Sequence, residues 1–183
     1  MRLTSFVVAL LPVLTPAIAL ADNPFGELGK QALETAKTEG VKAAKSEVND
    51  TVVKKVNAKL SAEARKNQCS FKKDKDELEA GCDAKAKRLA NVLIDVKKTL
   101  SASGLQSFKF IVTGHTDSFG TAEHNKELSL KRAAVMVREL TARGVPAGEI
   151  EAIGMGSEQM RVKPDNTEAK RAKNRRYEVS VKV

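Results

Sequence analysis

Residues 108–143 read FKFIVTGHTDSFGTAEHNKELSLKRAAVMVRELTAR. Large apolar residues alternate with others at the start of this run, which predicts a strand over 108–114. A polar loop follows, and Thr121 is suited to cap a helix that we expect over 122–143, where a glycine ends it. A strand, a loop and a long helix in this order are typical of an α/β domain.

The alternation of strands and helices continues on both sides of this run. We expect a helix over 83–102 before it, and after it strands near 150–155 and 177–183 with a short helix over 167–173 between them. The two-residue spacing of Cys69 and Phe71 suggests a further short strand before the first helix. The pattern predicts a two-layer α/β domain.

The region from Asp22 to Asn67 differs from the rest, because Lys, Glu and Ala dominate it. We expect one or two amphipathic helices there, broken near Gly40. Apolar residues recur at helical spacing at Val41, Ala44, Val48, Val52, Val56 and Leu60. Two interpretations are open: a solvated helical spacer that lies on the domain, or a coiled-coil or partner-binding helix whose stripe needs another chain.

The first residues, 1–21, have the features of a secretory signal peptide. Arg2 supplies a positive charge, an apolar run extends over 6–14, and Ala19-Leu20-Ala21 has the form of a cleavage site. Asp22 would then begin the mature chain. No later stretch is apolar enough to span a bilayer, so we expect an exported protein without a transmembrane span.

Charge is abundant, at 30% of residues, with a formal net charge of +9. In an exported protein this excess meets anionic lipid head groups and cell-wall polymers, so nucleic acid is a minor interpretation. Aromatic residues make up 4% of the chain and Trp is absent, which predicts an aliphatic core.

The two cysteines, Cys69 and Cys82, are expected to form a disulfide, because export takes the chain to an oxidising compartment. Closing a loop of this size is worth roughly 3 kcal/mol. A metal site would need further ligands, and the two histidines, His115 and His124, form no pattern of that kind.

Arg132 is unusual, since its helical position lies close to the apolar stripe and arginine is rarely buried without a partner. Asn125 and Ser129 lie on the same side of the helix, and Asp117 lies in the loop ahead of it. Asp117 and Arg132 could form a salt bridge that ties the loop to the helix. Alternatively they form a zwitterion clamp, in which Asp117 takes an ammonium and Arg132 a carboxylate.

Catalytic interpretations have little support, because the sequence shows no Ser/His/Asp ordering, no glycine-rich phosphate loop and no cluster of metal ligands. His115 beside Asp117 could be an acid/base pair, but no nucleophile stands nearby. We expect no enzyme activity, no cofactor and no metal.

Several spaced motifs resemble the OmpA C-terminal family, also called OmpA-like. The resemblance covers about 68–183, whereas 71–75 departs from the usual first-strand motif by placing lysine where an aromatic residue is expected. The matching residues are Thr113 to Gly120, Asn125, Leu128-Ser129, Arg132-Ala133, Gly144-Val145, Gly154, Gly156, Asn166 and Asn174-Arg175-Arg176.

The resemblance implies a βαβαβ domain that holds peptidoglycan non-covalently through the diaminopimelate of the stem peptide. The family's two ligand contacts fall on Asp117 and Arg132, which favours the clamp over the salt bridge. Thr116 and Asn125 match neighbouring pocket positions. Asn174 and Arg176 match scaffold positions of the last strand.

We therefore expect three segments: a signal peptide at 1–21, a helical spacer at 22–67 and an OmpA-like domain at 68–183. The protein would link a component of the periplasm or outer membrane to the wall of a Gram-negative bacterium. The alternative is an envelope adaptor that binds a protein partner or itself through 22–67, with the domain as wall localiser.

Overall fold

A computed structural model describes residues 42–72 and 74–183, with side chains from Asn49 onward. The predicted signal peptide and the predicted break near Gly40 lie outside the described residues. From β1 to β3 the elements follow the predicted βαβαβ order, which confirms the α/β fold class. The elements are α2 (Lys42–Lys66), α3 (Cys82–Ala102), β1 (Lys109–His115), α4 (Ala122–Thr141), the 3-10 turn η1 (Ala147–Glu149), β2 (Ile150–Gly154), α5 (Glu168–Asn174) and β3 (Arg176–Lys182).

The three strands form one sheet in the order β2-β1-β3, with β2 parallel and β3 antiparallel to β1. Side chains of one face are buried in a core shared with α2, α3 and α4. Glu151 and Ile153 of the opposite face are exposed. The sheet therefore has its helices packed on one face, as a two-layer domain requires. The side chains that the sheet contributes to this core are Phe110, Val112, Ile150, Tyr177, Val179 and Val181.

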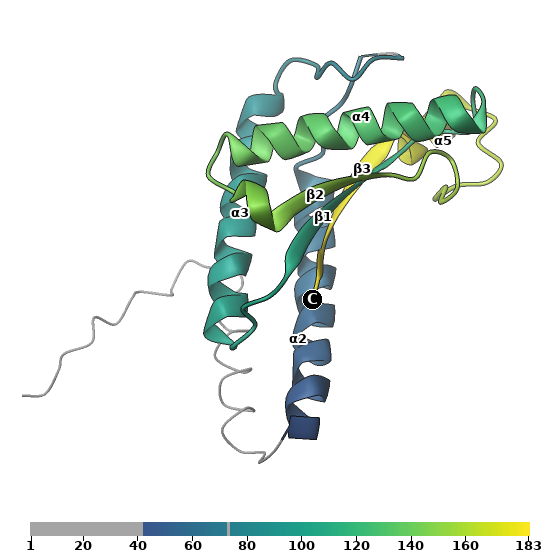
Figure 1. Cartoon of the computed structure of the whole chain (residues 1–183). Coiled ribbons are helices and arrows are strands. Elements are labelled where there is room, and N and C mark those ends of the chain that lie inside the picture. The colour runs from purple at the N-terminus through teal and green to yellow at the C-terminus, as the bar shows by residue number, and fades with distance from the viewer. Residues whose placement is uncertain (1–41, 73) are drawn as a thin grey trace, which may run out of the picture.

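Two paired glycines let α4 approach the sheet closely. Gly114 of β1 pairs with Gly154 of β2, and α4 crosses both strands (Figure 1). A Cβ atom on Gly114 would lie 2.1 Å from the backbone oxygen of Ser129, and one on Gly154 would lie 2.6 Å from the backbone nitrogen of Leu130. Any side chain at either position would push away the helix that carries the predicted site residues.

Helix α2 lies beside β3 (Figure 1) and covers the outer edge of that strand. The side-chain amide of Asn57 donates to the carbonyl of Val181 at 3.0 Å and accepts from its N–H at 2.6 Å, as a neighbouring strand would. The stripe of α2 is buried in the common core at Val52, Val56, Leu60 and Ala64.

The described part of the N-terminal stripe is thus covered by the chain's own core. Its earlier members, Val41, Ala44 and Val48, lie outside the described side chains. The assignment of 22–67 as a spacer segment stays a prediction, and so does a coiled coil or partner contact through this segment. In the described part of the chain, no helix is both long and apolar enough to cross a membrane.

The predicted disulfide is confirmed: Cys69 and Cys82 are bonded, with their Cα atoms 5.2 Å apart. The short strand suggested at 69–71 was wrong, because Phe71 forms only one isolated bridge, with Leu78. Helix α2 occupies the edge of β3, so this segment has no sheet edge there to join. The segment is instead fixed by the disulfide to the start of α3.

Candidate functional site

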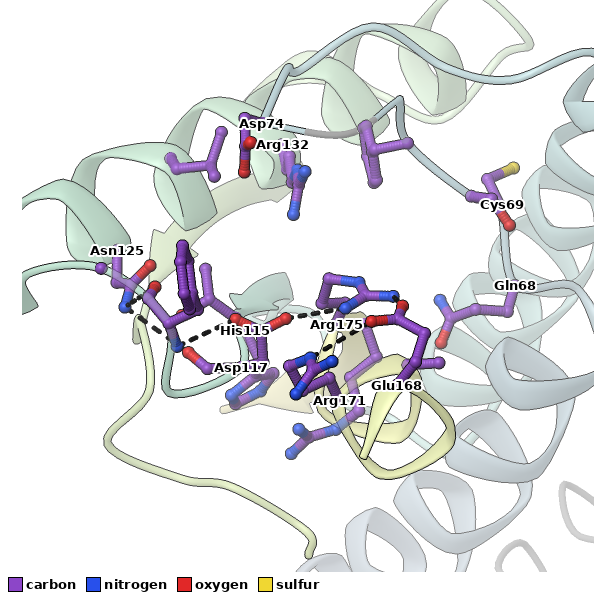
Figure 2. A pocket seen from close by; sticks show the side chains of 18 of the residues that line it. Gln68, Cys69, Asp74, His115, Asp117, Asn125, Arg132, Glu168, Arg171 and Arg175 are labelled. Carbon is purple, nitrogen blue, oxygen red and sulfur yellow. Dashed lines mark hydrogen bonds and ion pairs between the residues drawn. The ribbon is translucent and has the colours of Figure 1, made fainter. Parts of the chain in front are cut away.

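A cleft of about 1090 Å³ lies between the loop after β1, the start of α4, residues 68–71 with Asp74, and α5. Figure 2 shows Arg132 and Asp74 on one side of the open space and Asp117, Glu168 and Arg175 on the other. We call the side formed by Phe71, Asp74 and Arg132 the Arg132 wall, and the side formed by Asp117, Glu168 and Arg175 the Asp117 wall.

Asp117 directly follows β1 and is only 8% exposed. Its Oδ1 accepts from the backbone N–H of Phe119 at 3.1 Å, and its Oδ2 accepts from Nη1 of Arg175 at 2.7 Å. Arg175 also forms an ion pair with Glu168. Burial pulls the pKa of Arg175 down, but its bonds to the two carboxylates outweigh burial and raise that pKa. Asp117 is therefore a carboxylate that already holds a cation.

Arg132 projects from α4 and is 6% exposed. Its Nε donates to the carbonyl of Lys75 at 2.9 Å, its Nη2 to that of Lys72 at 3.3 Å, and its guanidinium carbon lies 5.2 Å from the ring centre of Phe71. Among the described residues, no carboxylate lies within ion-pair distance of it. Burial lowers the pKa of Arg132 and the charge of Arg175 lowers it further, while the carboxylates of Asp74, Asp117 and Asp76 oppose this shift without reversing it. A desolvated cation beside a cleft favours an anionic ligand.

The salt bridge considered between Asp117 and Arg132 is not formed, because Asp117 pairs with Arg175 instead. Both residues nevertheless line the same cleft. They lie on opposite sides of it (Figure 2), so a ligand between them could reach both charges.

The two neighbouring residues predicted for the site also line this cleft. The backbone N–H of Thr116 donates to the carbonyl of Gly156 at 2.9 Å, while its buried hydroxyl has no hydrogen-bond partner in the described part of the chain. The side-chain amide of Asn125 donates to the carbonyls of Phe119, at 3.0 Å, and Asp117, at 3.5 Å. Asn125 therefore holds the loop, whereas Thr116 offers an unused polar group.

Sequence reasoning missed Arg175 and Glu168 as members of the cleft. Arg175 stood in the matched Asn174-Arg175-Arg176 motif, where only the other two residues were assigned a role. Those two have scaffold contacts: the side-chain oxygen of Asn174 accepts from the backbone N–H of Arg161 at 2.8 Å, and Nε of Arg176 donates to Glu178 at 2.8 Å. The sequence feature that could have identified Arg175 as a cleft residue is its position one residue before the last strand.

A second carboxylate, that of Asp165, fixes the loop from its other side. It accepts from the hydroxyl of Ser118 at 2.6 Å, from the backbone N–H of Ser118 at 3.0 Å and from the side-chain amide of Asn174 at 3.1 Å. The hydrogen bonds from Ser118 are the main cause that lowers the pKa of Asp165 to about 2. The loop between β1 and α4 is therefore held in one conformation.

His115 is buried, and neither ring nitrogen has a hydrogen-bond partner among the described residues. Burial, and next the charge of Arg176, lower the pKa of His115 to about 4, so its imidazole is neutral at pH 7. It forms no acid/base pair with Asp117, since no hydrogen bond joins them. Within the described ranges, no group of three or more His, Cys, Asp or Glu side chains is placed to hold a metal ion.

Curated relatives match parts of the chain. It is 40% identical over 68 residues to a peptidoglycan-associated lipoprotein of Pasteurella multocida, a match that covers 37% of this chain and 45% of the relative. It is 50% identical over 46 residues to outer membrane protein A of Klebsiella pneumoniae, covering 25% of this chain and 13% of the relative. The chain thus matches less than half the length of either relative.

Solved structures share the fold. The peptidoglycan-associated lipoprotein of Burkholderia pseudomallei matches with a TM-score of 0.51 and 26% identity, over 63% of this chain and 89% of that one. The C-terminal domain of Helicobacter pylori MotB matches with a TM-score of 0.53 and 20% identity, over 63% and 84%, which shows the fold alone. Residues 70–175, more than half of the chain, match the model of the OmpA family, and the chain therefore belongs to that family.

Proposed function

We propose that this protein binds peptidoglycan without covalent attachment, and that its cleft takes the free centre of diaminopimelate in the stem peptide. That centre carries an ammonium and a carboxylate on one carbon. The observation that carries the proposal is the buried Arg132 guanidinium, without a carboxylate partner in the described chain, across an open cleft from Asp117. A zwitterion between them would meet an opposite charge at each end.

The carboxylate of the ligand would bind Arg132. The two carbonyl bonds of Arg132 use two of the five N–H donors of a guanidinium, and the rest can fork onto a carboxylate. Because the cleft already keeps water from this charge, the ion pair would gain attraction without the full cost of desolvating arginine on binding.

The ammonium of the ligand would bind Asp117. Arg175 now pairs with that carboxylate, but it also forms an ion pair with Glu168. When the ligand ammonium binds Asp117, Arg175 can remain paired with Glu168. Thr116 lines the same cleft. Its hydroxyl is buried and lacks a partner within the described residues, so it would bond a polar ligand atom only if its side chain rotated toward the cleft.

Similar proteins support this proposal, since relatives from Pasteurella multocida and Burkholderia pseudomallei are named peptidoglycan-associated lipoproteins. We place the protein in the periplasm or on the periplasmic face of the outer membrane, and we assign it binding without catalysis. No observation favours the adaptor alternative in the described part of the chain, because Val52, Val56 and Leu60 are covered by the chain's own core and are not open to a partner.

Cosedimentation of the protein with purified diaminopimelate-type peptidoglycan tests the proposal. Wild type should pellet, and Asp117→Ala and Arg132→Ala should stay in solution. Asp50→Ala and Arg138→Ala are matched controls, because each removes one charge from an exposed position. Equal pelleting by all five proteins would contradict the clamp, because binding would then not depend on Asp117 or Arg132.

A further inference from the structure

Phe119 is the most exposed of the large apolar side chains in the described part of the chain. Its side chain is 79% exposed, in the loop between β1 and α4, and it lines the cleft two residues after Asp117. At this position the face of the ring is open to a ligand that extends out of the cleft.

The backbone around this ring is fixed on both sides. The N–H of Phe119 donates to Asp117 at 3.1 Å, and its carbonyl accepts from Asn125 at 3.0 Å. The preceding residue, Ser118, is bonded through its N–H and hydroxyl to Asp165 at 3.0 and 2.6 Å. The ring is thus presented by an ordered loop, so a ligand that stacks on it would lose little entropy in ordering the protein.

We propose that the ring of Phe119 stacks on a pyranose ring of the glycan strand, while Asp117 and Arg132 hold the stem peptide. The inference rests on the proposed function. A pyranose presents a face of C–H groups, and these carry the partial positive charge that the face of an aromatic ring attracts. In the wall polymer, two amino acids separate diaminopimelate from the sugar, a span of roughly 7 Å or more. Diaminopimelate in the cleft and a sugar on Phe119 could therefore bind at the same time.

The surroundings of Phe119 favour a sugar over a lipid or a protein partner. Its exposed neighbours are Ser118, Gly120 and Thr121 in the loop and Ala122, Glu123 and His124 in the first turn of α4, so Phe119 is the one large apolar side chain in this exposed stretch. Lipids and protein partners bind contiguous apolar patches. A sugar has an apolar face with hydroxyls around it, which matches one ring with a polar border.

Binding of two soluble ligands to the full chain would test this inference. One is a disaccharide with its diaminopimelate stem peptide, and the other is the same stem peptide without sugar. We expect Phe119→Ala to weaken binding of the sugar-bearing ligand about tenfold and to leave the sugar-free peptide unchanged. Phe119→Leu should lose affinity as the alanine variant does, and Phe119→Trp should retain it, because stacking needs an aromatic face.

The outcomes separate this inference from the proposed function. If wild type binds both ligands and Phe119→Ala changes neither, or weakens both equally, the stacking inference is wrong while the clamp stands. Rescue by Phe119→Leu would point to a general apolar contact and would also overturn stacking. If wild type binds neither ligand, the proposed function itself fails. Folding is not at risk, because the ring is exposed and the loop is held by backbone atoms.

Discussion

The two walls of the cleft hold their charges in different ways. On the Asp117 wall, the carboxylate of Asp117 is neutralised by Arg175, which Glu168 also holds. On the Arg132 wall, the guanidinium is buried and bonded to the neutral carbonyls of Lys72 and Lys75, with no carboxylate in ion-pair distance among the described residues.

This difference shows which wall depends on a ligand. The Asp117 wall is electrostatically complete, and a ligand ammonium there exchanges one cation for another. The Arg132 wall carries a desolvated guanidinium that the carboxylates of Asp74, Asp117 and Asp76 attract without forming an ion pair, and an incoming anion would supply the direct partner that it lacks among the described residues. We therefore expect most of the binding free energy to come from the carboxylate of the ligand.

The largest effect should come from Arg132→Leu, which removes the charge that defines the Arg132 wall. We expect affinity for a diaminopimelate stem peptide to fall about a thousandfold, because the ligand carboxylate would be buried without a partner. Calorimetric titration would measure the loss. The exposed Arg138 on the same helix supplies the control, and Arg138→Leu should bind like wild type. Similar losses of affinity in both variants would show that the loss does not depend on the position of Arg132, and would contradict the proposed difference between the walls.

The next largest effect concerns the disulfide that fixes the segment of the Arg132 wall. Replacing Cys69 and Cys82 together by serine should lower the free energy of unfolding by about 3 kcal/mol, because the unfolded chain gains the entropy of an open loop. Urea denaturation would measure it, with Ser70→Ala as a control in the same segment. An unchanged midpoint would mean that the segment is held by its other contacts alone.

A smaller effect should appear in the pH dependence of stability, through His115 beneath the Asp117 wall. Its folded pKa is about 4 and its ordinary value 6.5, so between these values the unfolded chain takes up a proton that the folded chain does not. Stability should be complete above pH 6.5 and fall by about 2 kcal/mol from pH 7 to 5. His115→Gln should lose this slope and His124→Gln, at an exposed position, should keep it.

The smallest effect is expected for Arg175→Gln on the Asp117 wall. It removes the cation that competes for Asp117, so affinity for the stem peptide should rise about threefold, as for a rim charge. Lys173→Gln, an exposed change of equal charge two residues before Arg175, should have no effect in the same titration. Weaker binding by Arg175→Gln would instead indicate that Arg175 contacts the ligand. Each wall would then hold an arginine that binds the ligand, and the difference between the walls would disappear.

Most of the domain could be predicted from the sequence, since its periodicity is strong. Helix α4 begins at Ala122 with its first turn capped by Thr121, whose hydroxyl accepts from the N–H of His124 at 3.2 Å, as expected. The three strands follow the alternation seen from Phe108 to Val112 and near both other strand positions. The stripe of α2 predicted a helix face but not its partner, because periodicity does not say which surface covers it.

Four members of the site could be predicted from the sequence, whereas Arg175, Glu168 and the ion pairs within the site could not. Asp117, Arg132, Thr116 and Asn125 all line the cleft, as the family motifs suggested, while their contact with a ligand stays a proposal. The pairing of Asp117 with Arg175 joins residues 58 positions apart, which no local pattern reveals. Arg175 and Arg176 are neighbours in the same motif and both line the cleft, and only the fold shows that Arg175 is the one that pairs with Asp117.

The most direct test of the clamp compares stem peptides that carry diaminopimelate with otherwise identical peptides that carry lysine. Lysine keeps the ammonium of the free centre and lacks its carboxylate. We predict that wild type binds the diaminopimelate peptide at least about a hundredfold more tightly, and that Arg132→Leu binds both peptides equally. Equal binding of the two peptides by wild type would contradict the account, because Arg132 would then take no ligand carboxylate.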